Sequence, residues 1–439
     1  MSQLRSAPGA TWIILALIVA ACGSSGQTGQ PTPSSNSTAS PNPTSKPSPA
    51  ETVTINFWHN YNEDSPENEV LVNKLIPQFE DTHPGIKVVP LTIPYPDFRR
   101  KLITSISGGN APDVIRIDAT WVPEFADMGA LVALDQEMSE FAALKATVYP
   151  GPLGSNLWKD HYYGLPLDTN TKVWIYNDSL YSAAGISSAP ATIGDLDGLC
   201  ANLKKANPDS YMLGLESTQG WVMLPWIWSS GGEITDEAIT TASGYLNGPK
   251  TVGAYETLLR LYDQGCIAPL ILGDGVDAFS GIGQGLYASL DNGPWTYPIV
   301  AGAHPELKLT AALFPAGAAG SIDIVGGQDV NVLTQSAHKA EALEFVRFLV
   351  GSDFQLAMGG VGVIPVRQDL DVSSLVASQP YMSVFFDQLK TARARLAHPG
   401  WSDMDRILTD AGQLILRHEQ SPQAALDDAA TKINEILGD

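Results

Sequence analysis

Aromatic side chains gather near the predicted ends of strands and in loops, and the chain contains 10 Trp and 14 Tyr residues. Indole and phenol rings offer flat apolar area with a polar handle, which suits the C–H faces of a pyranose ring while neighbouring groups bond its hydroxyls. We expect about half of the following set to be buried structure, with Trp174 and Trp226 in the core: Trp58, Trp121, Trp158, Tyr162, Tyr163, Trp174, Trp221, Trp226, Trp228, Trp295 and Tyr297.

Motifs for catalysis or for phosphate binding are absent from the sequence. There is no G-x-S-x-G, no H-E-x-x-H and no Walker-type loop, and His418-Glu419 lacks a second His at the required spacing. The glycines of 281–285 have the wrong spacing for a nucleotide loop and predict a flexible turn. We therefore expect no catalytic residue, cofactor or metal site, although 47 carboxylates leave a glycosidase pair open.

The balance of charge excludes one large class of partner. With 25 Lys and Arg against 47 Asp and Glu, the formal charge is 25 − 47 = −22. Binding of nucleic acid needs clustered cations that release counterions from phosphates. The acidic surplus instead indicates a solvated surface on an exported protein.

The N-terminal segment predicts export and a lipid anchor. The apolar run Trp12 to Ala21 follows Arg5 and is about half of the roughly 20 residues that a membrane-spanning helix requires. It ends in Val19-Ala20-Ala21-Cys22 and resembles a bacterial lipobox, which implies a signal peptide at 1–21 and acylation of Cys22. An ordinary secretory signal with an incidental Cys is the alternative. The Ser-, Thr- and Pro-rich stretch 22–52 is expected to be a tether.

From Val53 the pattern alternates between strands and helices. Strands are predicted at 53–58, 86–89 and 113–117, with helices at 69–79 and from Pro96 to Gly108. A β-α-β-α-β run favours a mostly parallel sheet that binds ligands beyond the carboxyl ends of its strands. The loops after Trp58 and Ile117 are therefore the expected positions of binding residues.

A second series of elements follows Gly164. Strands are predicted at 172–176, 212–215 and 286–290, and Asn247-Gly248-Pro249 begins a helix that ends at Gly265. Helices at 341–350, 353–358, 403–416 and 422–437 are expected to pack outside the lobes. The economical arrangement is an α/β fold of two lobes, lobe 1 being 53–162 with about 308–345, and lobe 2 being 163–307 with about 346–439 and the C-terminal helices.

Two cysteines remain for the globular part. In an oxidising compartment Cys200 and Cys266 could form a disulfide, but the sequence does not say whether their Cα atoms are close enough. Two separate buried thiols are the alternative.

An ordered set of short motifs resembles the extracytoplasmic sugar-binding proteins of ABC importers, of the maltose/maltodextrin-binding type. The resemblance covers nearly the whole globular part. It implies the two-lobed periplasmic-binding-protein fold with a hinge between the lobes. Its motifs are Phe57-Trp58-His59-Asn60, Ala111-Pro112-Asp113-Val114, Gly164-Leu165-Pro166, Tyr176-Asn177, Trp221 to Gly231-Gly232, Asn292-Gly293-Pro294-Trp295, Gly326-Gly327-Gln328 and Glu344 to Leu349.

The resemblance also implies the ligand contacts. Asp118 matches a carboxylate that accepts hydrogen bonds from sugar hydroxyls, and a helix N-cap is its structural alternative. Trp221 and Trp295 match stacking aromatics, and an aromatic near Trp401 does not align securely. The implied contacts are His59, Asn60, Asp64, Asp118, Trp121, Trp221, Trp295, Gly326, Gly327 and Gln328.

The function so implied is high-affinity binding of a carbohydrate, a di- or oligosaccharide, by a monomer that delivers it to the transmembrane permease of an ABC transporter. The protein would be anchored by lipid on the outer face of the cell membrane, without enzymatic activity. One alternative is a receptor for a glycerophosphodiester or other charged solute, for which Arg116 and Arg367 are the candidate cations. An exported glycoside hydrolase is the alternative from another class.

Overall fold

The computed structural model describes residues 52–438. The predicted signal peptide, Cys22 and nearly all of the tether lie outside these residues. The described residues belong to one compact unit.

The first sheet is built around the strand that the sequence predicts after Val53. In β1 (Val53–His59) apolar and polar side chains alternate, and Ile55 and Phe57 are buried. The strand order is β11-β10-β3-β1-β2, and β6 is a further partner of β10 that lies off this path. The bounds of the other strands are β2 (Ile86–Thr92), β3 (Val114–Asp118), β6 (Leu165–Asn170), β10 (Ile324–Val332) and β11 (Arg393–Ala394).

Pairing in this sheet is mixed. β1 is parallel to β2 and β3, as the β-α-β-α-β pattern predicts, and β11 is parallel to β10. β10 runs antiparallel to β3 and β6. The sequence-distant strand β10 therefore lies in the middle of the sheet, with Gln328 opposite Asp118.

The second sheet has the order β8-β7-β9, with β7 (Val173–Asn177), β8 (Ser289–Asn292) and β9 (Leu309–Ala312). Its three strands pair antiparallel, so this sheet differs from the mostly parallel one expected. The mixture of helices and sheets confirms the α/β class. The predicted strand 212–215 forms only isolated parallel bridges, from Leu213 to Ile267 and from Gly214 to Leu290. A short hairpin of β4 (Leu157–Trp158) and β5 (His161–Tyr162) completes the strands of the described part.

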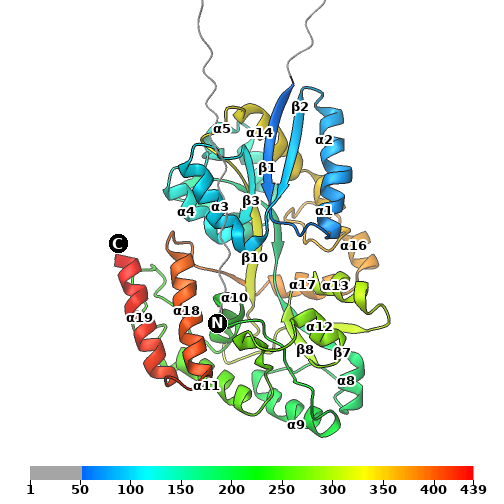
Figure 1. Ribbon diagram of the computed structural model, residues 1–439, viewed down its shortest axis with the longest axis vertical. Helices are drawn as coiled ribbons and strands as arrows, with labels where there is room; N and C mark the ends of the chain where they lie inside the picture. Colours follow the sequence, from blue (N-terminus) through cyan, green and yellow to red (C-terminus); the bar gives the residue numbers. More distant parts are fainter. Residues whose placement is uncertain (1–51, 439) are drawn as a thin grey trace, which may run out of the picture. The chain divides into compact units, whose positions relative to one another are not determined.

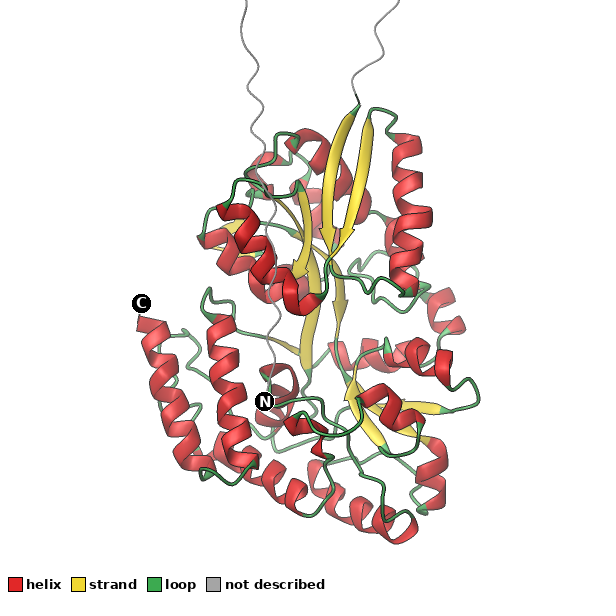
Figure 2. Cartoon of the chain, in the orientation of Figure 1, coloured by secondary structure: helices red, strands yellow, loops and turns green. Residues whose placement is uncertain are grey.

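The chain passes between the two sheets at three places that lie side by side (Figure 1). β6 leads through Thr171 and Lys172 into β7. Residues 313–323 lead from β9 to β10. The third passage follows β11, which pairs with β10 and continues to α18 (Trp401–Leu416). Figure 2 shows the strands in yellow with red helices around them.

Helices cover both faces of the first sheet. The helices that the sequence predicts at 69–79 and from Pro96 are present, and the former contains the π-helical turn η1 just before Pro77, which lacks an N–H for a regular helix. The helices up to residue 160 are α1 (Pro66–Val70), η1 (Leu71–Leu75), α2 (Ile76–Thr82), α3 (Tyr95–Ser107), η2 (Ala119–Trp121), α4 (Val122–Asp127), α5 (Leu134–Glu137), α6 (Phe141–Thr147) and α7 (Pro150–Gly154).

The remaining helices surround the second sheet or return to the first. They are α8 (Asp178–Ala183), η3 (Ile193–Asp195), α9 (Leu196–Ala206), α10 (Gly220–Ser229), α11 (Pro249–Asp263), η4 (Pro269–Leu272), α12 (Ala278–Gly283), α13 (Thr296–Ala303), α14 (Lys339–Leu349), α15 (Ser352–Gly359), α16 (Ser373–Ser378), α17 (Met382–Leu389), α18 and α19 (Pro422–Gly438). The glycines predicted as a flexible turn at 281–285 instead end α12, where Gly281 packs on the Tyr287 ring.

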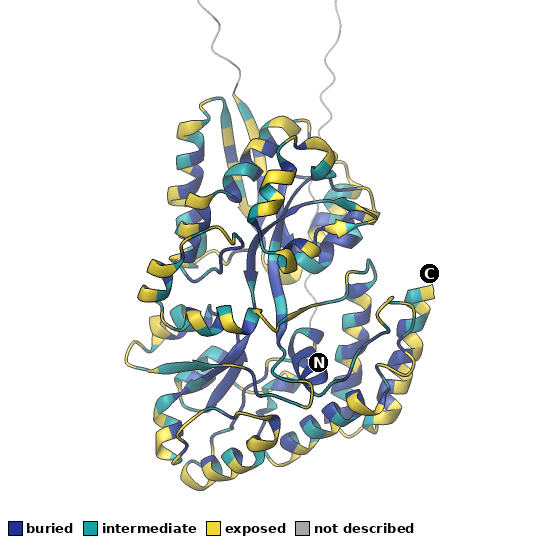
Figure 3. Cartoon of the chain, turned by 180° about the vertical axis from the view of Figure 1, so that it is seen from behind, coloured by how far each residue is buried: buried dark blue, intermediate teal, exposed yellow. Residues whose placement is uncertain are grey.

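The C-terminal helices take part in the cores, which corrects the expectation that they lie outside the lobes. Phe345 of α14 and Phe354 of α15 pack with Phe57 of β1, so the core of the first sheet extends beyond residue 345. Helices α18 and α19 contribute apolar residues to the large core beside the second sheet. We call the second sheet and the helices around it the second region, and the first sheet with its helices the first region. Their hydrophobic faces are buried in these cores, and their outer faces are largely exposed (Figure 3).

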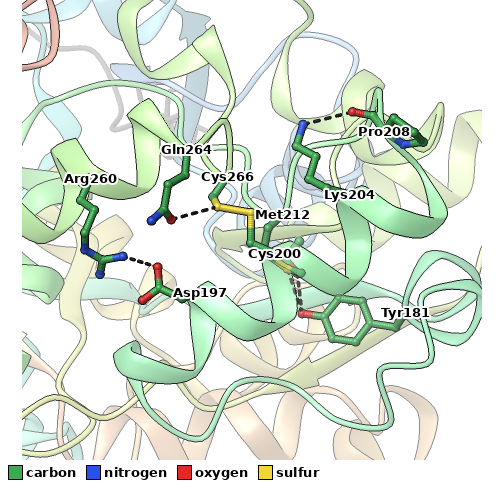
Figure 4. Close-up of a disulfide and its surroundings, with 10 residues drawn as sticks. Tyr181, Asp197, Cys200, Lys204, Pro208, Met212, Arg260, Gln264 and Cys266 are labelled. Carbon is green, nitrogen blue, oxygen red and sulfur yellow. Dashed lines mark hydrogen bonds and ion pairs between the residues drawn. A yellow bond between two sulfur atoms is a disulfide. The ribbon is translucent and has the colours of Figure 1, made fainter.

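The two tryptophans expected in the core are there. Trp174 is 0% and Trp226 is 1% exposed, and both belong to the core of the second region. In that core Cys200 and Cys266 form a disulfide, with Cα atoms 5.7 Å apart (Figure 4). The bond joins α9 to the segment after α11.

Two features are absent from residues 52–438. None of their helices is both long and apolar enough to cross a membrane. Within the same residues no three His, Cys, Asp or Glu side chains converge in a way that could hold a metal ion.

Candidate functional site

Polar side chains meet at the carboxyl end of β1 and β3, where the fold predicts a ligand site. Asn60 follows β1, and its amide donates to Gln328 on β10 over 3.0 Å. The Asn60 carbonyl oxygen accepts from Arg116. Three predicted contact residues, Asn60, Asp118 and Gln328, are thus held at one edge of the first sheet by the central position of β10.

Arg116 anchors this edge from within. Its guanidinium pairs with Asp168 over 2.7 Å, and both side chains are less than 10% exposed. The cation also lies 3.8 Å from the ring centre of Tyr61. Arg116 is therefore neutralised inside the sheet, and Arg367, the other cation considered for a charged solute, pairs with Asp369.

Asp118 has the structural role that its position predicts, that of a helix N-cap. Its carboxylate caps η2 by accepting from the Thr120 backbone N–H over 2.9 Å. It also accepts from the Tyr95 hydroxyl at 3.1 Å and from Arg395 at 3.2 Å. Arg395 comes from the passage between β11 and α18, so the carboxylate joins the first sheet to a segment that leads into the second region.

Arg395 in turn lies against Trp221. The guanidinium carbon is 5.4 Å from the centre of the half-buried Trp221 ring, which α10 supplies. Lys172 lies 5.6 Å from the same ring. Two cationic hydrogen-bond donors thus lie over this indole ring.

The two adjacent glycines of β10 are required by close approach. A methyl group on Gly326 would lie 2.7 Å from the Trp221 ring and 2.2 Å from the Asn170 side chain. Gly327 has a φ of +146°, which side chains rarely adopt. A register shift follows directly, between Gln328 and Asp329, so a β-bulge or irregularity also lies here.

A pocket of about 240 Å³ is lined by these glycines of β10, by α7 and by the passage after β11. Its polar lining includes Thr120, Ser155, Asp168, Asp329 and Arg395. The Ser155 hydroxyl donates to Asp329 over 2.8 Å, and burial raises the pKa of this carboxyl to about 7.

Trp295 stands at the start of α13 and is half-buried. Its ring packs over Gly293, where a methyl group would lie 2.2 Å from it. The preceding Asn292 donates to Glu216 over 3.2 Å. Trp221 and Trp295 belong to the second region, and neither lines the pocket beside β10.

Three of the predicted contact residues occupy other surroundings. His59 is fully buried between Phe57 and Tyr61, and burial together with Arg116 lowers its pKa to about 3. Trp121 is 7% exposed and stacks on Tyr95 and Phe98 within a core. Asp64 is exposed in the loop after β1. The neutral, enclosed His59 therefore has the surroundings of a structural residue.

Sequence reasoning missed several residues that the structure brings to this place. Tyr95 and Arg395 bind Asp118, and Asp405 of α18 accepts from the Gly220 backbone at 2.6 Å. Trp401 is 2% exposed and lies beneath Gly220, so the C-terminal segment does reach the site, through Arg395 and Asp405. The Arg-rich run before Trp401 was the available signal.

Comparisons with known proteins agree with this architecture. A binding protein of Brucella abortus (strain 2308) is 26% identical over 365 residues, covering 82% of this chain and 88% of its own. An uncharacterised lipoprotein of Streptomyces antibioticus is 25% identical over 301 residues, covering 65% of this chain and 64% of its own.

Solved structures share the fold over most of the chain. The GacH receptor of Streptomyces glaucescens, solved unliganded and with acarbose, has a TM-score of 0.78 at 22% identity, covering 88% of this chain and 99% of its own. UgpB of Mycobacterium tuberculosis, solved with glycerophosphocholine, has a TM-score of 0.77 at 21% identity, covering 88% and 99%. The two-lobed fold is therefore confirmed.

A family model describes the same chain. Residues 64–356 match the model of the bacterial extracellular solute-binding proteins, and this range includes β3, β10 and the Trp221 and Trp295 segments. An extracellular family implies an exported protein. The chain belongs to the bacterial extracellular solute-binding protein family.

Proposed function

We propose that this exported protein binds an uncharged carbohydrate, a di- or oligosaccharide, and delivers it to the permease of an ABC transporter. The observation that carries the proposal is the half-buried Trp221 ring bordered by Arg395, which pairs with Asp118. A ring for stacking beside a fixed donor and acceptor is what a saccharide requires. The GacH receptor, which shares the fold, has been solved with acarbose.

The contacts we propose come from both regions. The first sheet contributes Asn60, Asp118 and Gln328, and the backbone at Gly326 and Gly327 allows close approach. The second region contributes Trp221 and Trp295. A solute held between them would favour a closed arrangement of two lobes, because its binding free energy differs between the open and closed states.

The energetic demand is modest. A dissociation constant of 1 μM corresponds to about −8.2 kcal/mol. One or two stacked rings and several hydrogen bonds to preorganised groups supply this, whereas each buried polar group left unpaired would cost about 1–3 kcal/mol.

Charge separates this proposal from its closest alternative, a glycerophosphodiester receptor of the kind that UgpB represents. Among the described residues, the three cations around the site already face carboxyl groups: Arg116 faces Asp168, Arg395 faces Asp118, and Lys172 faces Asp291. Burial raises the pKa of Asp405 nearby, and Arg395 opposes that shift. A phosphodiester would meet no surplus of positive charge here, so the balance favours a neutral ligand.

We further propose that the chain has no catalytic activity and is a monomer tethered to the outer face of the membrane through acylated Cys22. The sequence predicts lobes of 53–162 with about 308–345 and of 163–307 with about 346–439, and we propose one change to this division. We propose that residues 346–366 move with the first lobe, because Phe354 and Val366 share its core.

Calorimetry of the purified chain tests the function. Maltose, maltotriose and mannotriose are titrated beside glycerophosphocholine, and the mixtures are then analysed by chromatography. We expect micromolar binding of a saccharide, no heat with the phosphodiester and no new products. Binding of glycerophosphocholine alone would replace the carbohydrate proposal, and saccharide cleavage would make the protein a hydrolase.

A further inference from the structure

A cluster of buried charges lies where the chain passes between the two sheets. The Lys172 ammonium pairs with Asp291 and lies 3.9 Å from Asp323, and the three side chains are at most 1% exposed. They come from distant segments. Lys172 precedes β7, Asp291 lies in β8, and Asp323 precedes β10.

The cluster contains one cation and two carboxyl groups, so it needs a proton to be neutral. One oxygen of Asp291, Oδ1, and one of Asp323, Oδ2, are buried without a partner. A proton held by Asp323 and donated to Asp291 satisfies both oxygens at once. In agreement, burial and the neighbouring Asp291 raise the pKa of Asp323 well above its ordinary value.

Such a cluster is costly to bury, and replacing a buried ion pair by apolar side chains often leaves stability unchanged or improved. Stability alone therefore does not account for it. Its geometry offers another account, since the cluster links the paired strands β7 and β8 of the second sheet, through Lys172 and Asp291, to the segment that enters β10 at Asp323. Lys172 and Asp323 belong to two of the three passages between the sheets.

The cluster also contacts the proposed binding aromatics. Asp291 directly precedes the Asn292-Gly293-Pro294-Trp295 turn, and Asn292 donates to Glu216 over 3.2 Å. The Lys172 ammonium is 5.6 Å from the Trp221 ring. The cluster thus lies against the Trp221 ring and four residues before Trp295.

We propose that Lys172 is a positioning residue of the solute site. Through Asp291 it sets the turn that carries Trp295, through its own contact it sets the Trp221 ring, and through Asp323 it couples both to the start of β10. This inference deepens the proposed function and rests on the same site. It assigns to Lys172 no direct contact with the solute.

The primary test needs no ligand. Indole N–H resonances of the full chain labelled with ¹⁵N-Trp are assigned with Trp221→Phe, Trp295→Phe and Trp158→Phe. Lys172→Met is expected to shift or broaden the Trp221 and Trp295 resonances and to leave that of Trp158, which donates to Asp127 in the first region, unchanged. Unchanged Trp221 and Trp295 resonances would overturn the inference.

Three further variants distinguish a loss of folding from a loss of the positioning role of Lys172. Lys172→Met with Asp291→Asn removes both charges together, so it is expected to regain thermal stability while the two resonances stay displaced. Leu258→Ala destabilises the same core without touching the cluster. Arg260→Met removes an exposed ion pair with Asp197. Neither control is expected to move the two resonances, and recovery of both in the double variant would contradict the inference.

Affinity gives the second readout. For maltotriose we expect the dissociation constant to rise at least tenfold in Lys172→Met and in the double variant, and to change less than threefold in Leu258→Ala at a temperature where it is folded. Absence of maltotriose binding by the unaltered chain bears on the proposed function alone, because the resonance test still decides the positioning role.

Discussion

Two buried ion clusters flank the proposed site, and they differ in composition. Arg116 and Asp168 match one cation with one carboxylate, and Asn60 accepts a further bond from Arg116. The Lys172 cluster has two carboxyl groups for one cation. The first cluster joins β3 and β6 within one sheet, whereas the second joins the paired strands β7 and β8 of the second sheet to the segment that enters β10 of the first. Balanced charge thus occurs within one sheet, and the one surplus carboxyl group lies where the two sheets are linked.

The comparison predicts the largest loss of stability for Arg116→Met. This change leaves Asp168 buried without its cation, and breaking such a pair typically costs about 3–5 kcal/mol of unfolding free energy. Urea denaturation measures it. Arg116→Met with Asp168→Asn should recover most of the loss, and Arg367→Met, which removes a partly exposed pair, should cost less than about 1 kcal/mol. Equal losses in the two single variants would contradict the view that burial sets the cost.

Asp329 provides a third case, a buried carboxyl group bonded to Ser155 rather than to a cation. Its pKa is raised from 3.8 to about 7, so between these values the folded chain binds more protons than the unfolded chain. Its contribution to stability is present at low pH and is lost as pH rises through 7.

Asp329→Asn should therefore be as stable as the unaltered chain near pH 4 and more stable above pH 7, by at most about 4 kcal/mol. Thermal unfolding across pH 4–8 checks this. An advantage that is largest at pH 4 would show that the carboxylate is stabilised in the fold.

The aromatic side of the site is tested by Trp295→Ala. We expect solute binding to weaken by about 2 kcal/mol or more, as for a buried aromatic anchor, with the fold retained. Calorimetry and circular dichroism measure the two quantities. Trp158→Ala, on the β4–β5 hairpin, is the matched control and should bind normally. Unchanged affinity in Trp295→Ala would remove this ring from the site.

The smallest effect concerns that hairpin, which lies apart from both clusters. Lys159 and Asp160 adopt φ values of 45° and 68°, which favour Asn and Gly in a two-residue turn. Lys159→Asn with Asp160→Gly should add about 0.5–1 kcal/mol of stability in urea and leave solute affinity unchanged. A change in affinity would mean that the turn communicates with the site.

Much of the fold follows from local patterns. Alternation at β1, the capped helix α11 and the β-α-β-α-β run predict elements that the structure contains. The buried positions of Trp174 and Trp226 are likewise confirmed. What the patterns could not supply is pairing between distant segments, such as β10 with β3, because no local periodicity records which strand lies beside which.

The candidate site was likewise predictable only where it depends on local sequence patterns. Asn60, Asp118 and Gln328 meet at the sheet edge where strand ends are expected to gather. Arg395 was not predicted, because its position beside Asp118 depends on the course of the chain after β11. His59 and Trp121 could not be assigned from side-chain type, since the same rings serve a core or a binding surface according to the direction in which each one points.

The pairing of Asp118 with Gln328 has a consequence for how the chain is made. The strands that precede β10 in the sheet are synthesised long before their central partner, and about 210 residues separate the two positions. Contacts so distant in sequence make folding slow. The first sheet therefore cannot be completed until β10 has been synthesised, and an exported chain must pass through a secretion pore before it has folded.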